Sequence, residues 1–144
     1  MKAMMNTTDI DFLNEDYVSF EIADLMRMKG FPQKRENSGY YATEMVYGIT
    51  EQDDGTHHLC HQYPACYHFD DHICAPTLQI AIKWLRKKYN IFICVLFLEE
   101  SNGYGYTIEN IIEKKYIATS KNSSYNEPED ACEAAIKHCL TKII

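Results

Sequence analysis

The chain lacks any apolar run long enough to cross a membrane. A membrane-spanning helix needs about 18 consecutive apolar residues, whereas the longest run in these 144 residues extends only from Ile91 to Leu98. The opening residues, MKAMMNTTDIDF, also lack the apolar stretch of a secretory signal. We therefore expect a protein of the cytoplasm with no membrane partner and with its six cysteines reduced.

The motifs of common catalytic and phosphate-binding sites are missing as well. Gly103-Tyr104-Gly105 has neither the further glycines nor the following helix of a phosphate-binding loop. Pro64-Ala65-Cys66 is not followed by the second cysteine that the zinc site of base deaminases requires. The sequence predicts no catalytic residue and no cofactor, although it leaves open a Cys–His pair that meets only in the folded chain.

Basic residues are scarce, and they are unevenly placed. The chain has 14 Lys and Arg against 21 Asp and Glu, a net charge of -7 that argues against general nucleic-acid binding. Residues 1–72 carry 5 basic and 13 acidic side chains, whereas residues 73–144 carry 9 basic and 8 acidic ones. Any site for an anion is therefore expected in the second half.

Hydrophobic periodicity and turn residues predict an α+β fold. The predicted elements are a helix at 17–29 with Asp16 as its cap, strands at 40–50 and 57–63, a helix at 77–89, strands at 91–98 and 104–112, a short strand at 115–119 and a last helix from 128. This order, α-ββ-α-ββ-α, favours one antiparallel sheet of four to five strands with three helices on one face. We expect residues 1–15 to form a flexible arm and residues 16–144 a single domain.

Five histidines and three cysteines fall within residues 57–74. These residue types suit zinc, but their spacing matches no standard zinc site. The simpler interpretation is a polar hairpin with scattered histidines and no metal. If a metal does bind, its best four ligands are Cys60, Cys66, His72 and Cys74.

The predicted helix at 77–89 has apolar residues on two sides. Its core face consists of Leu78, Ala81, Ile82, Leu85 and Tyr89. Ile80 and Trp84 lie on the opposite side, one turn apart and beside Lys87. They either pack against another part of the chain or form a surface for a ligand or a protein. In the second case we expect a two-fold dimer through Ile80, Trp84 and Lys87.

The same helix is rich in basic residues that could join aromatic side chains elsewhere. The candidate basic and aromatic site consists of Lys83, Trp84, Arg86, Lys87, Lys88, Tyr104, Tyr106, Lys114 and Lys115. Such a site suits the base and phosphate of a nucleotide. The alternative is an ordinary solvated helix face.

Four stretches of the sequence together resemble a known family. They are VSFEIADLMRMKGF (18–31), APTLQIAIKWLRKKYNIFICV (75–95), GYGYTIENI (103–111) and EPEDACEAAIKHCLTKII (127–144). They are similar to small uncharacterised proteins of phages and prophages of gut Bacteroidetes, which pair fEIAkLLkeKGF with APTyqqaldWLReKynI and close with yeEALeaaIkeaLklI. The resemblance covers about half the chain and departs at residues 40–74. It implies a mobile-element setting and assigns no catalytic residue.

Three functions remain as hypotheses from the sequence. The first is a non-enzymatic phage accessory protein that binds a host protein and forms a homo-oligomer in the host cytoplasm. The second is a phage protein that sequesters a nucleotide signal of host defence, which the basic and aromatic residues favour. The third is a metal-dependent or cysteine enzyme, which the histidines and cysteines of residues 57–74 favour.

Overall fold

The computed structural model has an α+β fold, as the sequence predicts. It describes residues 16–33, 48–60, 73–120 and 124–144, so the expected arm at residues 1–15 lies outside the described part. The elements are α1 (Phe20–Met28), β1 (Gly48–Glu51), β2 (His57–Cys60), β3 (Ile73–Cys74), α2 (Leu78–Tyr89), β4 (Ile91–Leu98), β5 (Gly103–Asn110), β6 (Lys115–Thr119), α3 (Pro128–His138) and a π-helical turn η3 (Cys139–Ile143).

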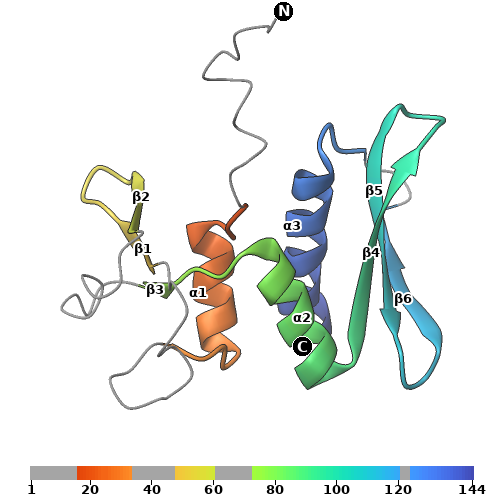
Figure 1. The fold of residues 1–144 in the computed structure, drawn as a ribbon, viewed down its shortest axis with the longest axis horizontal. Helices are drawn as coiled ribbons and strands as arrows, with labels where there is room; N and C mark the ends of the chain where they lie inside the picture. Colours follow the sequence, from red (N-terminus) through yellow and green to blue (C-terminus); the bar gives the residue numbers. More distant parts are fainter. Residues whose placement is uncertain (1–15, 34–47, 61–72, 121–123) are drawn as a thin grey trace, which may run out of the picture.

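The strands form two sheets, which corrects the expectation of a single sheet. Among the described residues, one antiparallel sheet has the order β2-β1-β3 and the other the order β4-β5-β6. Figure 1 shows why the two hairpins do not pair: α1 lies next to β1 and β3, and α2 and α3 lie between α1 and the second sheet. The helices therefore form a layer between the two sheets.

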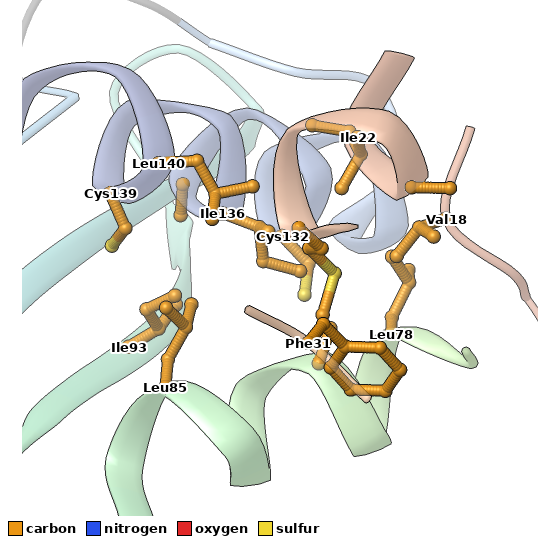
Figure 2. Packing of buried hydrophobic residues seen from close by; sticks show 14 of the residues in the cluster. Val18, Ile22, Phe31, Leu78, Leu85, Ile93, Cys132, Ile136, Cys139 and Leu140 are labelled. Atoms are coloured by element: carbon orange, nitrogen blue, oxygen red, sulfur yellow. The ribbon is translucent and has the colours of Figure 1, made fainter. Parts of the chain in front are cut away.

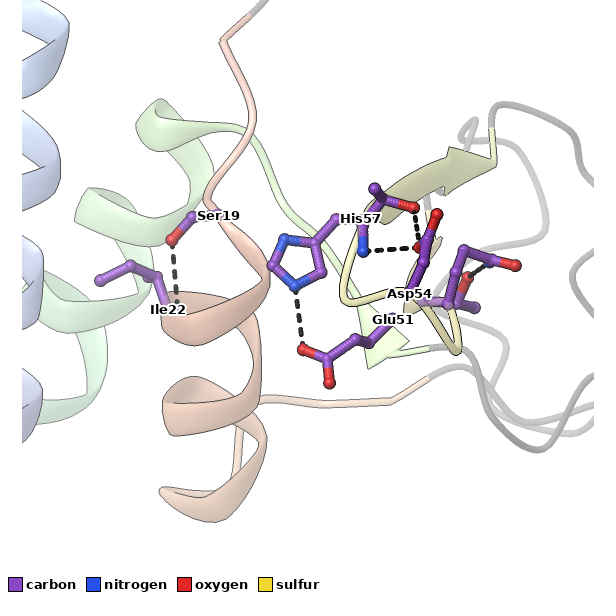
Figure 3. A network of polar contacts seen from close by, with 8 residues as sticks. Ser19, Ile22, Glu51, Asp54 and His57 are labelled. Atoms are coloured by element: carbon purple, nitrogen blue, oxygen red, sulfur yellow. Dashed lines mark hydrogen bonds and ion pairs between the residues drawn. The ribbon is translucent and has the colours of Figure 1, made fainter.

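Local signals position the first two helices closely. α1 begins three residues later than expected, because Tyr17 is held in an extended bridge with Thr77. Ser19 therefore replaces Asp16 as the cap, and its side chain accepts a hydrogen bond from the Ile22 N–H at 3.3 Å (Figure 3). Thr77 caps α2 in the same way, through the Ile80 N–H.

A left-handed residue joins α2 directly to the second sheet. Asn90 has a φ of 58°, a conformation that asparagine tolerates better than most residues, and it ends α2 one residue before β4. The Ile111 N–H donates to the Asn90 carbonyl at 3.0 Å. This bond fixes the end of α2 against the turn that follows β5.

One hydrophobic core connects the helices to the second sheet. Ile22 of α1, Leu85 of α2, Ile136 of α3 and Ile108 of β5 are each at most 1 % exposed. Figure 2 shows the side chains of the three helices converging with Ile93 in this core. Apolar burial is the main source of stability for a domain of this size. None of the helices among the described residues is long and apolar enough to cross a membrane.

Shortening Leu85 should destabilise the protein strongly. The Leu85 side chain is fully buried in the core, and Leu85→Ala should cost about 2–5 kcal/mol because it leaves a cavity. Ile80 is on the same helix but 43 % exposed, so Ile80→Ala should change stability by about 0.5 kcal/mol or less. Urea unfolding followed by circular dichroism measures both. Equal losses would contradict this assignment of the core face of α2.

Burial of the α3 thiols should make stability depend on alkaline pH. Burial raises the pKa of the Cys132 thiol to about 11 and that of Cys139 to about 12. Unfolded thiols ionise near pH 8.5, so above that pH the unfolded chain releases protons that the folded chain retains. Stability therefore falls as pH rises.

Replacing one of these thiols should remove its share of the alkaline loss. Between pH 8 and pH 10, the wild type should lose about 2 kcal/mol more than Cys139→Ala. Urea unfolding at the two pH values tests this difference. The same loss in both proteins would contradict a buried, protonated Cys139.

Candidate functional site

The sheet β4-β5-β6 has one face covered by helices and one face without a helix. Along β4, Ile91 and Ile93 are buried, whereas Phe92 and Cys94 are exposed. α2 and α3 both contact β4, and α3 also contacts β5. Because successive side chains of a strand point to opposite faces, the helices cover the face of Ile91 and Ile93. Among the described residues, no helix covers the face that carries Phe92 and Cys94.

The pairing of the strands extends this second face across the sheet. Phe92 pairs with Glu109, which in turn pairs with Tyr116. Directly paired residues carry their side chains on the same face. The outer sheet face, as we call it, comprises Phe92, Cys94, Leu96 and Leu98 of β4, Gly103, Gly105, Thr107 and Glu109 of β5, and Tyr116 and Thr119 of β6.

Exposed apolar side chains are concentrated on this sheet. Eight large hydrophobic residues are exposed among the described residues, and six belong to the sheet or to the turn between β5 and β6. These six are Phe92, Phe97, Ile111, Ile112, Tyr116 and Ile117. Tyr116 is 73 % exposed and lies on the outer sheet face. Such a concentration of apolar groups on a protein surface is typical of an interaction site.

A hollow of about 570 Å³ opens beside the turn between β4 and β5. Leu96, Leu98 and Thr119 of the outer sheet face contribute to its lining. Its charged groups are Glu99 and Glu100, and both are exposed to solvent. Phe97 and Tyr106, which belong to the opposite face of the strands, line it as well, so the hollow lies at the end of the sheet beside an acidic turn. It lacks the desolvated charged group that is typical of a catalytic pocket.

Trp84 packs within its own chain, which is the first of the two alternatives that the sequence leaves open. Its ring meets those of Phe31 and Tyr89 edge to face, each at 5.4 Å between centroids. Lys88 places its Nζ 5.5 Å from the Trp84 centroid and donates to the Lys29 carbonyl at 3.3 Å. The Trp84 side chain thus joins α2 to the segment that follows α1.

The other two members of the expected dimer surface remain open to solvent. Ile80 is 43 % exposed, and Lys87 is exposed as well. With Trp84 occupied by Phe31, Ile80 is a single apolar residue among polar ones on this side of α2. The dimer through Ile80, Trp84 and Lys87 stays a prediction, and the surface available for it has less exposed apolar area than the sequence suggests.

The structure separates the tyrosines of the candidate nucleotide site from its basic residues. Tyr104 and Tyr106 lie in the half of β5 near the turn that follows β4, whereas α2 ends beside Asn90 and Ile111 at the other end of the sheet. The six residue steps from Tyr104 to Asn110 span roughly 20 Å along the strand. Tyr106 is also buried, and burial raises the pKa of its hydroxyl.

The basic residues of that candidate site fall in two neighbouring groups. Lys83, Arg86, Lys87 and Lys88 belong to α2, and three of them form its last turn. Lys114 and Lys115 lie at the turn between β5 and β6, which the bond from Ile111 to Asn90 holds near the end of α2. Cations at a helix C-terminus stabilise the helix dipole, so the last turn of α2 has a structural explanation without a ligand.

The candidate metal ligands lie only partly in the described residues. Cys66 and His72 lie outside them, and Cys74 is buried. The strand register places Cys60 and Cys74 on opposite sides of Gly48, which puts their backbones roughly 10 Å apart. Within the described ranges, no three His, Cys, Asp or Glu side chains gather as metal ligands would.

His57, from the same histidine-rich segment, has partners of its own. Its Nε2 lies 3.0 Å from Glu51 Oε2 across the β1–β2 hairpin (Figure 3). Its ring also stacks on Phe20 of α1. The hairpin turn is closed by Asp54, whose side chain accepts from the Thr56 N–H at 2.9 Å. The stacking on Phe20 holds the hairpin to α1, whereas the other two contacts lie within the hairpin, so His57 has a structural role.

The outer sheet face is the candidate site that sequence reasoning missed. None of the eight residues from Ile91 to Leu98 is polar, a pattern that is typical of a strand buried on both faces. The number of predicted helices was the signal that could have indicated an uncovered face. Burial on both faces needs a covering layer on each side, and the two helices that contact β4 both cover one face.

No family model matches the chain, and neither the curated proteins nor the solved structures provide a match.

Thiol reactivity should distinguish the outer sheet face from the core. Cys94 is exposed, whereas Cys132 and Cys139 are buried with a raised pKa. Because the thiolate is the reactive form, iodoacetamide at pH 7.5 should modify Cys94 first and the two α3 thiols only after unfolding. Peptide mass spectrometry over time measures the order. Early modification of Cys139 would contradict the packing of α3 on the sheet.

Proposed function

We propose that this protein acts by binding another protein, without catalysis, through the outer sheet face. The observation that carries the proposal is the uncovered apolar surface around Phe92 and Tyr116, which are 40 % and 73 % exposed. Aromatic side chains give large contact area at a small entropic cost and are enriched in protein interfaces. Glu109 lies between the two aromatic residues and supplies one charged group for specificity.

The state of the buried cysteines supports a binding role over a cysteine enzyme. A nucleophilic cysteine needs a lowered pKa and access to substrate. Burial raises the pKa of Cys132 and of Cys139 instead, and both side chains are buried in the core. Of Cys74, Cys94, Cys132 and Cys139, Cys94 is the exposed one, and its thiol contacts the Val95 carbonyl at 3.9 Å.

The resemblance to phage and prophage proteins suggests where the partner is found. A protein of a mobile element that works in the host cytoplasm meets host proteins at high concentration. We therefore propose a phage accessory role with a host protein as the partner. The alternative of nucleotide sequestration has less support, because Tyr104 and Tyr106 lie far along β5 from the end of α2.

Charged substitutions on the two candidate surfaces test the proposal. Tagged wild type and Phe92→Asp/Tyr116→Asp should be compared in capture experiments from a lysate of a gut Bacteroidetes host. We expect the double variant to lose host proteins that the wild type captures, because a carboxylate in an apolar contact must be desolvated. Ile80→Asp is the matched control on α2, and it should capture the same proteins as the wild type.

The outcomes of this comparison separate the candidates. Loss of capture with Ile80→Asp and retention with the sheet variant would move the site to α2. Retention of every captured protein by both variants would reject the outer sheet face. Circular dichroism on each variant checks that the fold is intact, which surface positions should allow.

A further inference from the structure

β4 is an edge strand, and its backbone groups on one side have no partner among the described residues. Tyr104 exchanges hydrogen bonds with Tyr125, and Tyr106 with Ser120, so both direct their N–H and C=O away from β4. Backbone groups alternate between the two sides of a strand. Gly105 and Thr107 therefore bond to β4, and their partners there are Leu96 and Cys94.

The same alternation identifies the free groups of β4. Ile91, Ile93, Val95 and Phe97 must direct their N–H and C=O away from β5. The bond from the Ile111 N–H to the Asn90 carbonyl fits the same alternation. Apart from a weak contact of the Cys94 thiol with the Val95 carbonyl at 3.9 Å, these groups have no partner among the described residues. Four consecutive outward-facing residues thus present a ladder of donors and acceptors.

The two edges of this sheet differ in how they discourage pairing. β6 is five residues long, begins with Lys115, and its pairing with β5 contains a register shift between Ile108 and Glu109. Charge, short length and bulges are the usual devices that keep an edge strand unpaired. β4 has eight residues, no charge and no register shift. Its edge is therefore open to pairing with another strand.

We propose that the β4 edge pairs with the β4 edge of a second copy of this chain, in antiparallel orientation about a two-fold axis at Cys94. In this register Ile91 pairs with Phe97 of the second copy and Ile93 with Val95, so all four outward-facing residues find hydrogen-bonding partners. Phe92 then lies opposite Leu96, and Cys94 opposite its own copy. A shift by two residues in either direction leaves one of the four residues at the end of each strand unpaired.

Charge at the two ends of β4 supports a second copy as the occupant. The last turn of α2 is basic, with Arg86, Lys87 and Lys88, and leads into β4. Glu99 and Glu100 follow β4 directly. Antiparallel pairing brings the acidic end of each strand to the basic end of the other, which is favourable in both places at once.

The pairing goes beyond the proposed function and does not rest on it, because it uses the edge of β4 and not its face. It would join the β4-β5-β6 sheets of the two copies into one sheet of the order β6-β5-β4-β4-β5-β6. The outer sheet faces of both copies would then form one continuous surface, with the helices of both copies on the other side. Two-fold dimers are the commonest homo-oligomers, and a self-complementary edge is suited to this symmetry.

The register can be tested through Cys94, which is exposed. Opposed residues at a non-hydrogen-bonded position have Cα atoms about 4.5 Å apart, within the range of a disulfide. Diamide takes up two electrons and two protons as two Cys94 thiols join, and it becomes the hydrazine. We expect rapid conversion of the purified protein to a covalent dimer, and its loss in Cys94→Ser, which should keep the mass of a dimer in sedimentation.

A second pair of variants tests the register without the native thiol. The second test uses two variants, Phe92→Cys and Leu96→Cys, each in a Cys94→Ser background. Their new thiols lie opposite each other only in a dimer that contains one chain of each variant. We expect diamide to cross-link the mixture and to leave each variant alone largely uncross-linked. Val95→Pro removes an outward N–H that the single chain does not use, so it should halve the mass in sedimentation and keep the circular dichroism of the wild type.

Each other outcome overturns the proposal. A wild type that sediments as a monomer at millimolar concentration excludes the self-paired edge. A dimer that forms no Cys94 disulfide, or whose mixed variants do not cross-link, must use another register or another surface, such as Ile80 and Trp84 of α2. A monomer that captures a host protein and loses it with Val95→Pro would assign the edge to a strand of that partner.

Discussion

The packing of α2 and α3 on β4 and β5 is the contact on which the rest of the molecule depends. Ile93 and Ile108 meet across the two strands and face the helices, and both are buried. Leu85 and Ile136 close the same core from α2 and α3. Because a strand alternates its side chains, burial of one face decides which residues are left on the other. The outer sheet face is thus a direct consequence of where the helices lie.

The sequence predicted the elements of the second half well, because their signals are local. Thr77 and Asn90 mark the ends of α2, and the eight apolar residues after Asn90 form β4 as expected. Pro128 begins α3, and Cys132 and Ile136 lie on its buried side. In each case the deciding interaction lies within a few residues of the signal, so no knowledge of the tertiary structure was needed.

The grouping of the strands and the candidate site could not be predicted in the same way. Two hairpins on one chain can share a sheet or form separate sheets, and the choice depends on which helix lies between them. Trp84 illustrates the same limit, because its partner Phe31 is 53 positions away in sequence and belongs to the segment after α1. The helical pattern placed Trp84 opposite the core face of α2, whereas in the structure its ring packs against the core, on Phe31 and Tyr89.

The exposed face and the free edge of β4 are two parts of one physical problem. A strand with no polar side chain is stable when both its faces are buried and the backbone groups on both its sides are hydrogen-bonded. Among the described residues, β4 has helices on one face and one neighbouring strand, β5. Pairing of the edge with a second copy would satisfy the backbone groups but leave Tyr116 and the adjoining apolar side chains exposed, since β6 lies farthest from the shared edge. A further partner on the face would still be favoured. The edge of β4 and the outer sheet face therefore do not compete for a partner. A dimer would present the outer sheet face twice on one rigid sheet, so a partner with two matching surfaces that binds one copy would meet the second copy at a high effective concentration.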